Sequence, residues 1–368
     1  MTDPGTTSRE NVLVLYTELA PYVLACFAAW SAQHNVNIHL VHWPVNTEAP
    51  FALEFAPGVM AYDRATLDDK ALLELALRLS PRVVMASGWV DKGYLKACRA
   101  LKKKGVHSVM SFDTAWRGTL KQWANVILSR FTLSRTFSHA WVTGALQQSY
   151  ARRLGFRSER IKTGFYSADT ARFLPLGERL LAKRSTAWPK RFLCVARYIP
   201  SKGHQLLCDA FAELCDAGEA GDWELWMTGA GELQEQVMSS SSGKHERITH
   251  LGFKQANEMQ DVVEQCGVLV LPSTFEPWGV VVHEHACAGL PMILSSEVGA
   301  ADRFLVEGGN GHRFIAGDMA SLKGVLRMMM RSSSSELHAM GVKSAALGCA
   351  WTPSDWARTA SELMTRNA

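Results

Sequence analysis

The sequence lacks the features that mark membrane-spanning, secreted and metal-stabilised proteins. Its 368 residues contain no run of 18 consecutive apolar residues, so no transmembrane helix is expected. The apolar stretch from Leu19 to Ala32 is too short to span a bilayer and includes Pro21. The first ten residues, MTDPGTTSRE, are polar and not basic, which argues against a secretory signal. The eight cysteines include no C-x2-C pair, which argues against a structural zinc site and favours a reducing, cytoplasmic location.

Nucleic-acid binding is also poorly supported, because the formal net charge is only +4 and no nucleic-acid-binding motif is present. There is no internal repeat, and the short serine runs at 239–242 and 332–335 are typical of loops or helix caps. The hydrophobic content of 47% and the charged content of 20% are ordinary for a soluble globular protein. A chain of this length is expected to form about two domains.

Strand-like and helix-like segments alternate along the whole chain, which predicts an α/β fold with parallel sheets. The expected strands of a first sheet are 11–16, 37–43, 83–86, 108–112 and 141–143, and those of a second are 192–196, 224–228, 249–251, 268–271 and 292–295. The polar, basic stretch from Leu174 to Pro189 predicts the boundary between an N-terminal domain, 1–174, and a C-terminal domain, 175–350. Residues 351–368 include an amphipathic segment, Pro353 to Arg366, which predicts a final helix.

The most informative stretch, residues 272–291, reads PSTFEPWGVVVHEHACAGLP and holds two glutamates, Glu276 and Glu284. A buried strand is expected before it, and a helix of small residues from Glu284 to Gly289 is expected to carry the second glutamate. The loop between strand and helix therefore lies at the carboxyl end of a strand. Open α/β sheets bind their ligands at that edge, so the loop is the first candidate for a binding site.

The chemistry of this loop suits a ligand that combines phosphate with hydroxyl groups. Gly279 lets the backbone approach closely, and the amides of Gly279, Val280 and Val281 can receive a phosphate at a helix N-terminus. Two carboxylates beside a phosphate would repel it unless they face other groups, and the hydroxyls of a nucleotide sugar are suitable donors. Glu276 on the sugar and Glu284 on the ribose would satisfy every group. Each glutamate alone is also compatible with a solvated surface or a favourable place near a helix N-terminus.

Two other segments carry complementary chemistry. Residues 192–207, FLCVARYIPSKGHQLL, predict a strand, a loop and a helix, with Arg197 and Lys202 in the loop. Two cations beside a helix N-terminus make a site for a highly charged anion. The stretch WELWMTGAGE predicts a strand that ends at Thr228 and turns through Gly229 and Gly231. A bare Gly-x-Gly is a weak signal, which a tight strand-to-helix turn also explains.

Taken together and in this order, these motifs resemble the E-x7-E signature of retaining glycosyltransferases with the GT-B fold, especially glycosyltransferase family 4. The resemblance extends from about Phe192 to Phe314. It implies two Rossmann-like domains facing across a cleft, with the C-terminal helix crossing back to the N-terminal domain. It further implies a nucleoside-diphosphate sugar as donor, UDP before GDP, and a saccharide, lipid-linked or small-molecule acceptor, as in polysaccharide biosynthesis.

The resemblance also implies roles for individual residues. Arg197 and Lys202 would bind the donor diphosphate, Glu276 the transferred sugar and Glu284 the ribose. The other implied donor contacts are Gly279, Val280, Val281, Gly229, Phe253 and Lys254, the last two near the base. No protein nucleophile is implied, because an oxygen of the leaving diphosphate takes the acceptor proton on the same face of the sugar. The two cations stabilise the leaving group, so neither metal nor cofactor is expected, and no Asp-x-Asp motif is present.

The N-terminal half departs from the family pattern. The glycine pair that usually follows the first strand is replaced by TELAPYVLAC, which puts the phosphate contact of that loop in doubt. Many members carry a histidine after a later strand, where this chain reads VMSFDTAWRG and has Asp113. Asp113 is expected to bind acceptor hydroxyls or to act as a base, although a turn or cap residue would look the same. Trp116 and Arg117 are candidates for an acceptor cleft, and a tryptophan there could also belong to the core.

Two rival functions share the predicted fold. One is a GT-B sugar epimerase or phosphorylase, although a phosphorylase would need pyridoxal phosphate and a lysine for it, and no segment demands one. The other is a catalytically silent scaffold that binds a partner. The combination of Arg197, Lys202, Glu276 and Glu284 favours an active enzyme over the scaffold.

Basic residues are concentrated in the first half. Residues 1–170 hold 20 Lys and Arg against 13 Asp and Glu, and residues 114–158 hold seven Lys and Arg and no acid. Within the segment 120–139, Trp123, Ile127 and Phe131 recur at helical spacing. A basic amphipathic helix predicts peripheral contact with the inner face of an anionic membrane, or with an anionic acceptor. An ordinary core-facing helix with solvated basic residues is the alternative.

Overall fold

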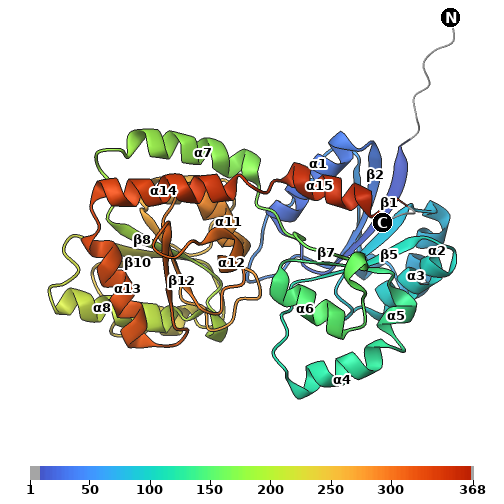
Figure 1. Ribbon diagram of the computed structural model, residues 1–368, viewed down its shortest axis with the longest axis horizontal. Coiled ribbons are helices and arrows are strands. Elements are labelled where there is room, and N and C mark those ends of the chain that lie inside the picture. Colours follow the sequence, from blue (N-terminus) through green and yellow to red (C-terminus); the bar gives the residue numbers. More distant parts are fainter. Residues whose placement is uncertain (1–8, 366–368) are drawn as a thin grey trace, which may run out of the picture. The chain divides into compact units, whose positions relative to one another are not determined.

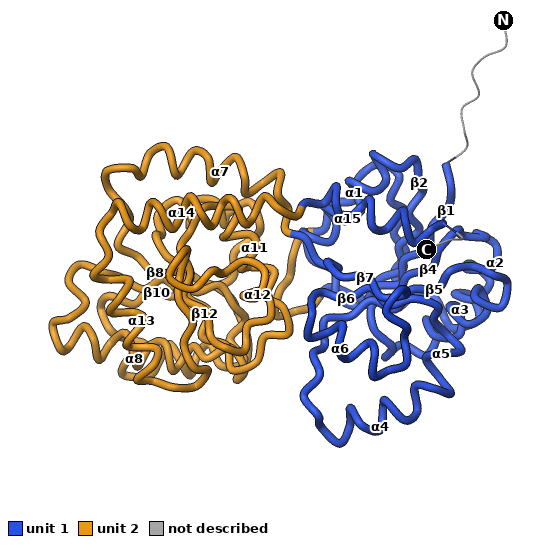
Figure 2. The backbone as a smooth tube through the Cα atoms, viewed as in Figure 1, with its two compact units in different colours: residues 1–45, 53–167, 352–368 blue, residues 46–52, 168–351 orange. Residues whose placement is uncertain are grey.

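The computed structural model describes residues 9–365. Residues 1–8 and 366–368, which include most of the polar N-terminal segment and the end of the predicted last helix, lie outside the described residues. The chain divides into two compact units (Figure 2). The first unit holds residues up to Val45, Leu53–Ser167 and the chain from Thr352 onward, and the second holds Asn46–Ala52 and Ala168–Trp351.

The first unit is built on a seven-stranded parallel sheet with strand order β3-β2-β1-β4-β5-β6-β7 (Figure 1). Its strands are β1 (Glu10–Tyr16), β2 (Val36–His42), β3 (Val59–Asp63), β4 (Val83–Ser87), β5 (His107–Phe112), β6 (His139–Val142) and β7 (Ile161–Lys162). Its α-helices are α1 (Pro21–Gln33), α2 (Asp69–Leu79), α3 (Lys92–Lys103), α4 (Leu120–Ser129), α5 (Leu133–Thr136), α6 (Ala145–Arg153) and α15 (Pro353–Glu362). Short 3-10 turns occupy Arg64–Thr66 and Ser158–Arg160.

The predicted strands of this sheet are those with continuous apolar runs. Residues 12–15 of β1 are fully buried, as expected for a central parallel strand covered by helices on both faces. Two strands, β3 and β7, were not predicted. β3 is an edge strand whose side chains are largely exposed, and β7 has only two residues, so neither carries a periodic apolar signal.

The final helix α15 packs against α1 in the first unit, which confirms the predicted return of the chain. A capping box between Thr352 and Asp355 begins the helix, with Pro353 in its first turn. Trp356 is buried, lies 5.8 Å from the Trp30 ring and donates its indole N–H to the carbonyl of Phe165 at 2.6 Å. The helix therefore completes the core of the first unit.

The second unit contains a six-stranded parallel sheet with strand order β10-β9-β8-β11-β12-β13. Its strands are β8 (Arg191–Val195), β9 (Glu224–Thr228), β10 (Ile248–His250), β11 (Val268–Leu271), β12 (Met292–Ser295) and β13 (Gly311–Phe314). Its α-helices are α7 (Thr170–Lys183), α8 (His204–Asp216), α9 (Gln234–Ser239), α10 (Met259–Gln265), α11 (Val280–Cys287), α12 (Ala301–Phe304), α13 (Met319–Arg331) and α14 (Ser334–Gly348). A 3-10 turn occupies Pro200–Lys202.

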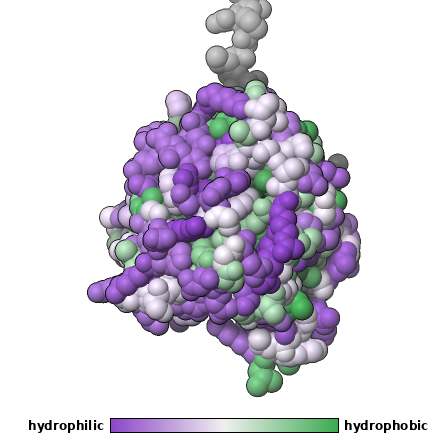
Figure 3. Space-filling view, turned by 90° about the vertical axis from the view of Figure 1, so that its left-hand side faces the viewer, coloured by the Kyte–Doolittle hydropathy of each residue, from purple (hydrophilic) through white to green (hydrophobic). Residues whose placement is uncertain are grey.

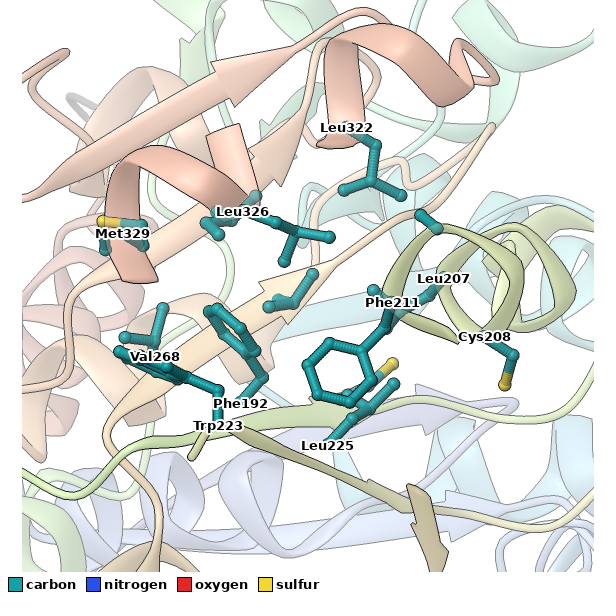
Figure 4. Close-up of a cluster of buried hydrophobic side chains, with 14 of the residues drawn as sticks. Phe192, Leu207, Cys208, Phe211, Trp223, Leu225, Val268, Leu322, Leu326 and Met329 are labelled. Atoms are coloured by element: carbon teal, nitrogen blue, oxygen red, sulfur yellow. The ribbon is translucent and has the colours of Figure 1, made fainter. Parts of the chain in front are cut away.

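Aromatic and aliphatic side chains fill the core beneath this sheet (Figure 4). Phe192 of β8 stacks on Trp223 with ring centroids 4.5 Å apart, and Phe211 of α8 meets Phe192 edge-on. Leu322 and Leu326 of α13 lie over the same cluster. These contacts fix β8 and α8, and therefore the loop that joins them.

The boundary between the units differs from the prediction. The units divide between Ser167 and Ala168, and α7 runs through most of the stretch that was predicted to link them. The helix contains Pro175, which costs a helix interior about 3 kcal/mol. Phe173, Leu176 and Leu180 are nevertheless buried at helical spacing, so packing outweighs that cost.

For the most part, the surface of the described residues has the mixture of hydrophilic and hydrophobic side chains that is usual for a folded protein. The face drawn in Figure 3 is largely hydrophilic, with hydrophobic side chains scattered over it. Within residues 9–365, no helix is both long and apolar enough to span a bilayer.

Candidate active site

The order of strands in the second sheet points to one place for a ligand. Strands β8 and β11 lie side by side at the centre, and the chain runs outward from β8 in one direction and from β11 in the other. In such sheets the crevice beyond the carboxyl ends of the two central strands is the usual binding site. The loop after β8 carries Arg197 and Lys202, and the loop after β11 carries Glu276 and Gly279. The residues predicted from two distant segments therefore lie at one edge of the sheet.

Gly279 has the conformation that the prediction required. Its φ of 90° is left-handed, and it is the N-cap of α11, so the amides of Val280 and Val281 lie in the first helical turn without intrahelical partners. A Cβ at Gly279 would come within 3.0 Å of the Glu276 side chain. The predicted helix start at Glu284 was wrong, because α11 begins four residues earlier, and the buried valines pack well enough to offset their low helix propensity.

Lys202 and Glu276 form an ion pair at this edge of the sheet. The Lys202 ammonium lies 2.5 Å from the Glu276 carboxylate, and each side chain is only 12% exposed. The loops that carry them are joined by a hydrogen bond from the amide of Thr274 to the carbonyl of Ser201 at 2.8 Å. The predicted diphosphate-binding cation and sugar-binding carboxylate are therefore direct neighbours that neutralise each other.

Arg197 is also paired with a carboxylate, one that the sequence did not point to. Its guanidinium lies 3.3 Å from Glu48, and both side chains are 36% exposed. Glu48 belongs to the short segment 46–52, which leaves the first sheet after β2 and belongs to the second unit. No local sequence signal marks this pairing, because the two residues are 149 positions apart.

Glu284 lies one and a half turns into α11 and has a strongly perturbed acidity. Burial and, to a lesser extent, the nearby carboxylate of Asp169 raise the pKa of its carboxyl to about 7. Arg172 opposes this rise and is itself 3.2 Å from Asp169. Asp169 and Arg172 were not predicted. They come to Glu284 because the imidazole of His283 accepts a hydrogen bond from the amide of Ala168 at 2.9 Å and thereby fixes the start of α7.

The remaining predicted donor contacts occupy neighbouring loops. Gly229, after β9, has a φ of 142°, and a Cβ there would lie 1.9 Å from the carbonyl oxygen of Ala196. Gly229 thus permits two loops to touch, which is a packing role. Phe253 and Lys254 follow β10, where the Phe253 ring meets Phe51 at 5.2 Å and Lys254 lies 4.0 Å from Glu258.

Asp113 belongs to the first unit, at the carboxyl end of β5. The hydroxyl of Tyr166 donates to the Asp113 carboxylate at 3.4 Å, and the side-chain amide of Gln147 donates to the backbone carbonyl of Asp113 at 2.9 Å. Burial and the charge of Asp113 raise the pKa of Tyr166 and of Tyr16 well above their usual range. Both phenols therefore remain protonated beside the carboxylate and can donate hydrogen bonds.

Trp116 and Arg117 follow Asp113 in a loop that is fixed by packing. The Trp116 ring contacts Tyr150 at 5.4 Å and Trp123 at 5.2 Å, and the guanidinium of Arg153 lies 4.6 Å above it. Arg117 is exposed, and its backbone amide donates to the side chain of Gln122 at 2.7 Å. The contacts of Trp116 are those of a residue that holds α4 and α6 together.

Known proteins share part of this sequence and all of this fold. Residues 189–331 match the family of group 1 glycosyl transferases. A segment of 145 residues is 31% identical to phosphatidyl-myo-inositol mannosyltransferase of Mycobacterium leprae, and covers 39% of this chain and 38% of that protein. The chain spans between 27% and 38% of the length of the curated relatives it matches.

Similarity of structure extends over nearly the whole chain. Anabaena HepE, solved in complex with UDP and glucose, superimposes with a TM-score of 0.71 at 15% identity, covering 96% of this chain and 99% of that one. Sucrose-phosphate synthase of Thermosynechococcus elongatus gives a TM-score of 0.73 at 15% identity, covering 96% and 98%. The protein has the GT-B fold. Together with the sequence match over residues 189–331, the fold supports a GT-B glycosyltransferase family 4-like protein.

Proposed function

We propose that this protein transfers a sugar from a nucleoside-diphosphate sugar to an acceptor hydroxyl with retention of anomeric configuration. The observation that carries the proposal is that the loops after β8 and β11 bring together Arg197, Lys202, Glu276 and the glycine-capped start of α11. Cations and free amides suit a diphosphate, and the carboxylate suits the hydroxyls of a sugar. UDP is the first candidate for the nucleoside diphosphate of the donor. A structural neighbour was solved in complex with UDP and glucose.

In the proposed reaction, the bond between the anomeric carbon and the diphosphate oxygen breaks while the acceptor oxygen bonds to the same face of that carbon. The acceptor proton passes to the departing diphosphate oxygen. Arg197, Lys202 and the amides of Val280 and Val281 stabilise the charge that develops there, and Glu276 orients the sugar through its hydroxyls. Donor binding must rearrange the pair between Lys202 and Glu276, because each partner then faces the ligand.

Asp113 is assigned to the acceptor side. It lies beside two protonated phenols at the carboxyl edge of the first sheet, where it can accept hydrogen bonds from acceptor hydroxyls. A reducing, cytoplasmic location is also part of the proposal, and it is supported by a sequence whose eight cysteines include no C-x2-C pair.

The proposal is tested by incubation with UDP-sugars and GDP-sugars. A binding nucleotide at a hundred times its dissociation constant should stabilise the protein by about 2.7 kcal/mol, which a thermal-shift screen detects. Release of nucleoside diphosphate from a sugar donor then separates an enzyme from a silent scaffold, and NMR of the product gives the anomeric configuration. A protein that is stabilised by none of these nucleotides would contradict the proposal.

The second part of the proposal concerns the helix α4, at the lower edge of the first unit in Figure 1. Leu120, Trp123, Ile127 and Leu128 are 49–88% exposed, so the core-facing alternative does not hold for this face. Phe131 is also exposed, but α4 ends at Ser129, so Phe131 lies outside the observed helix, contrary to the prediction that placed it on the same helical face.

Basic side chains accompany these exposed apolar groups, and together they suit an anionic membrane surface carrying a lipid-linked acceptor. Lys121, Arg130 and Arg135 are exposed and lie on or just after α4. Each cation near an anionic bilayer contributes about 1 kcal/mol, and salt screens that attraction. Sedimentation with vesicles rich in phosphatidylglycerol should therefore weaken as salt rises and when these three residues become glutamine. Equal sedimentation with neutral vesicles would contradict the electrostatic part, and none at low salt would remove the membrane contact.

A further inference from the structure

The segment 46–52 makes contacts that place it over residues of the proposed donor site. It leaves the first sheet after β2 and rejoins that unit at Leu53 before β3. Between those points the amide group of Gln255 donates to the carbonyl of Pro50 at 2.9 Å and accepts from the amide of Ala52 at 3.1 Å. Phe51 packs edge-on against Phe253. Both partners lie in the loop after β10, where the base was predicted to bind.

The backbone of the segment is organised by its own hydrogen bonds. The side chain of Asn46 accepts from the amide of Glu48 at 2.9 Å, and its carbonyl accepts from the amide of Ala49 at 3.1 Å. An asparagine that bonds to the backbone two residues later is a common way to fix a turn. The carboxylate of Glu48 is therefore presented on a formed turn that Gln255 and Phe253 hold from the other side.

The carboxylate of Glu48 lies on the guanidinium of Arg197, the cation assigned to the diphosphate. Carboxylates and phosphates use the same N–H groups of an arginine, so one anion excludes the other from a given face. Building on the proposed function, we propose that Glu48 is a resident counter-ion which the donor diphosphate must displace from Arg197. Glu48 would thereby lower donor affinity and make the release of segment 46–52 part of donor binding.

The size of the effect follows from the exposure of the pair. Both side chains are about one-third exposed. An ion pair of this exposure should weaken the apparent affinity for the competing diphosphate by about two- to fivefold. Glu48→Gln removes the charge and keeps the shape, so it should tighten binding of UDP by that factor. The gain should depend on Arg197, and it should vanish when Arg197 is also replaced.

The test is calorimetric titration of UDP, and of inorganic pyrophosphate, into the full chain. Wild type, Glu48→Gln, Arg197→Gln and the double variant form a cycle, and Glu54→Gln, an exposed carboxylate just beyond the segment, is the matched control. We expect tighter binding in Glu48→Gln only where Arg197 is present, and no change in the control. Amide exchange in 46–52 should also rise when UDP binds to wild type.

The outcomes separate this inference from the proposed function. If wild type binds UDP and Glu48→Gln binds it with the same affinity, the counter-ion role of Glu48 is overturned and the proposed function stands. Weaker UDP binding in Glu48→Gln also overturns that role, because the segment would then be part of the ligand site. A gain of the same size in the Arg197→Gln background also overturns it. Failure of wild type and of Glu48→Gln to bind either ligand overturns the counter-ion together with the proposed function.

Discussion

Replacement of Glu284 with glutamine should stabilise the protein at pH 8 and have much less effect at pH 5. The carboxyl has a pKa of about 7 in the folded protein, against an ordinary value of 4.5. Between these values the folded state holds a proton that the unfolded state has released, so stability falls as pH rises through this window. Above pH 7 the Glu284 carboxyl is ionised in both the folded and the unfolded state, and the loss of stability is complete.

The magnitude follows from the size of that difference. A shift of one pKa unit corresponds to about 1.4 kcal/mol, so an ionised Glu284 costs about 3 kcal/mol of unfolding free energy at pH 8 and less than about 1 kcal/mol at pH 5. Glutamine resembles the protonated carboxyl in shape and hydrogen bonding but cannot ionise. Glu284→Gln should therefore recover most of this cost at pH 8 and little at pH 5.

The measurement is urea unfolding at both pH values, followed by hydrogen exchange at the amides of α11. Exchange at one helix is preferable because a chain with two units need not unfold in a single step. Glu178→Gln, an exposed glutamate on α7, is the matched control and should change stability by less than about 0.5 kcal/mol at both pH values. An equal gain in unfolding free energy from Glu284→Gln at pH 5 and pH 8 would refute the reasoning. The cost of ionising a buried carboxyl depends on pH and cannot produce an equal gain at both values.

Three further predictions concern the proposed reaction. Lys202→Ala should weaken UDP binding at least tenfold in calorimetry, because a charge-assisted contact contributes about 1.5–3 kcal/mol, and unchanged affinity would remove Lys202 from the diphosphate. Because that change leaves Glu276 nearly buried without its partner, the double variant with Glu276→Gln should recover stability but not affinity. Glu276→Ala alone should preserve UDP binding while depressing turnover, and an equal loss of both would contradict its place on the sugar. Asp113→Asn should reduce transfer with donor affinity kept within about twofold, whereas full activity would make Asp113 a turn residue.

Much of the second sheet could be predicted because its signals are local. The strands β9, β11 and β12 have the predicted bounds, since each is a short apolar run with a turn at its end. The residues Arg197, Lys202, Glu276 and Gly279 lie at one edge of the sheet because parallel strands place their carboxyl ends there. The predicted alternation of strands and helices was enough to identify the edge of the sheet at which these residues lie.

Other features depend on contacts that no window of sequence contains. Glu48 lies 3.3 Å from Arg197, and the charge of Asp169 raises the pKa of Glu284, across sequence separations that only the folded chain closes. β3 was missed because an exposed edge strand has no apolar period, and α7 was taken for a linker because Pro175 and its polar neighbours hide a buried face. The start of α11 was misplaced because β-branched valines favour strands until a glycine cap and burial decide otherwise.

The position of α15 in the first unit has a consequence for synthesis on the ribosome. Trp356, which fills the core of that unit, emerges only after the second unit, which is complete once Trp351 has left the exit tunnel. The usual order, in which the N-terminal part of a nascent chain folds first, is therefore reversed. A stalled chain with residues up to Trp351 outside the ribosome should show protected amides in β8 and β11 but open amides in α1, and the amides of α1 should become protected only in longer stalled chains in which α15 has also emerged.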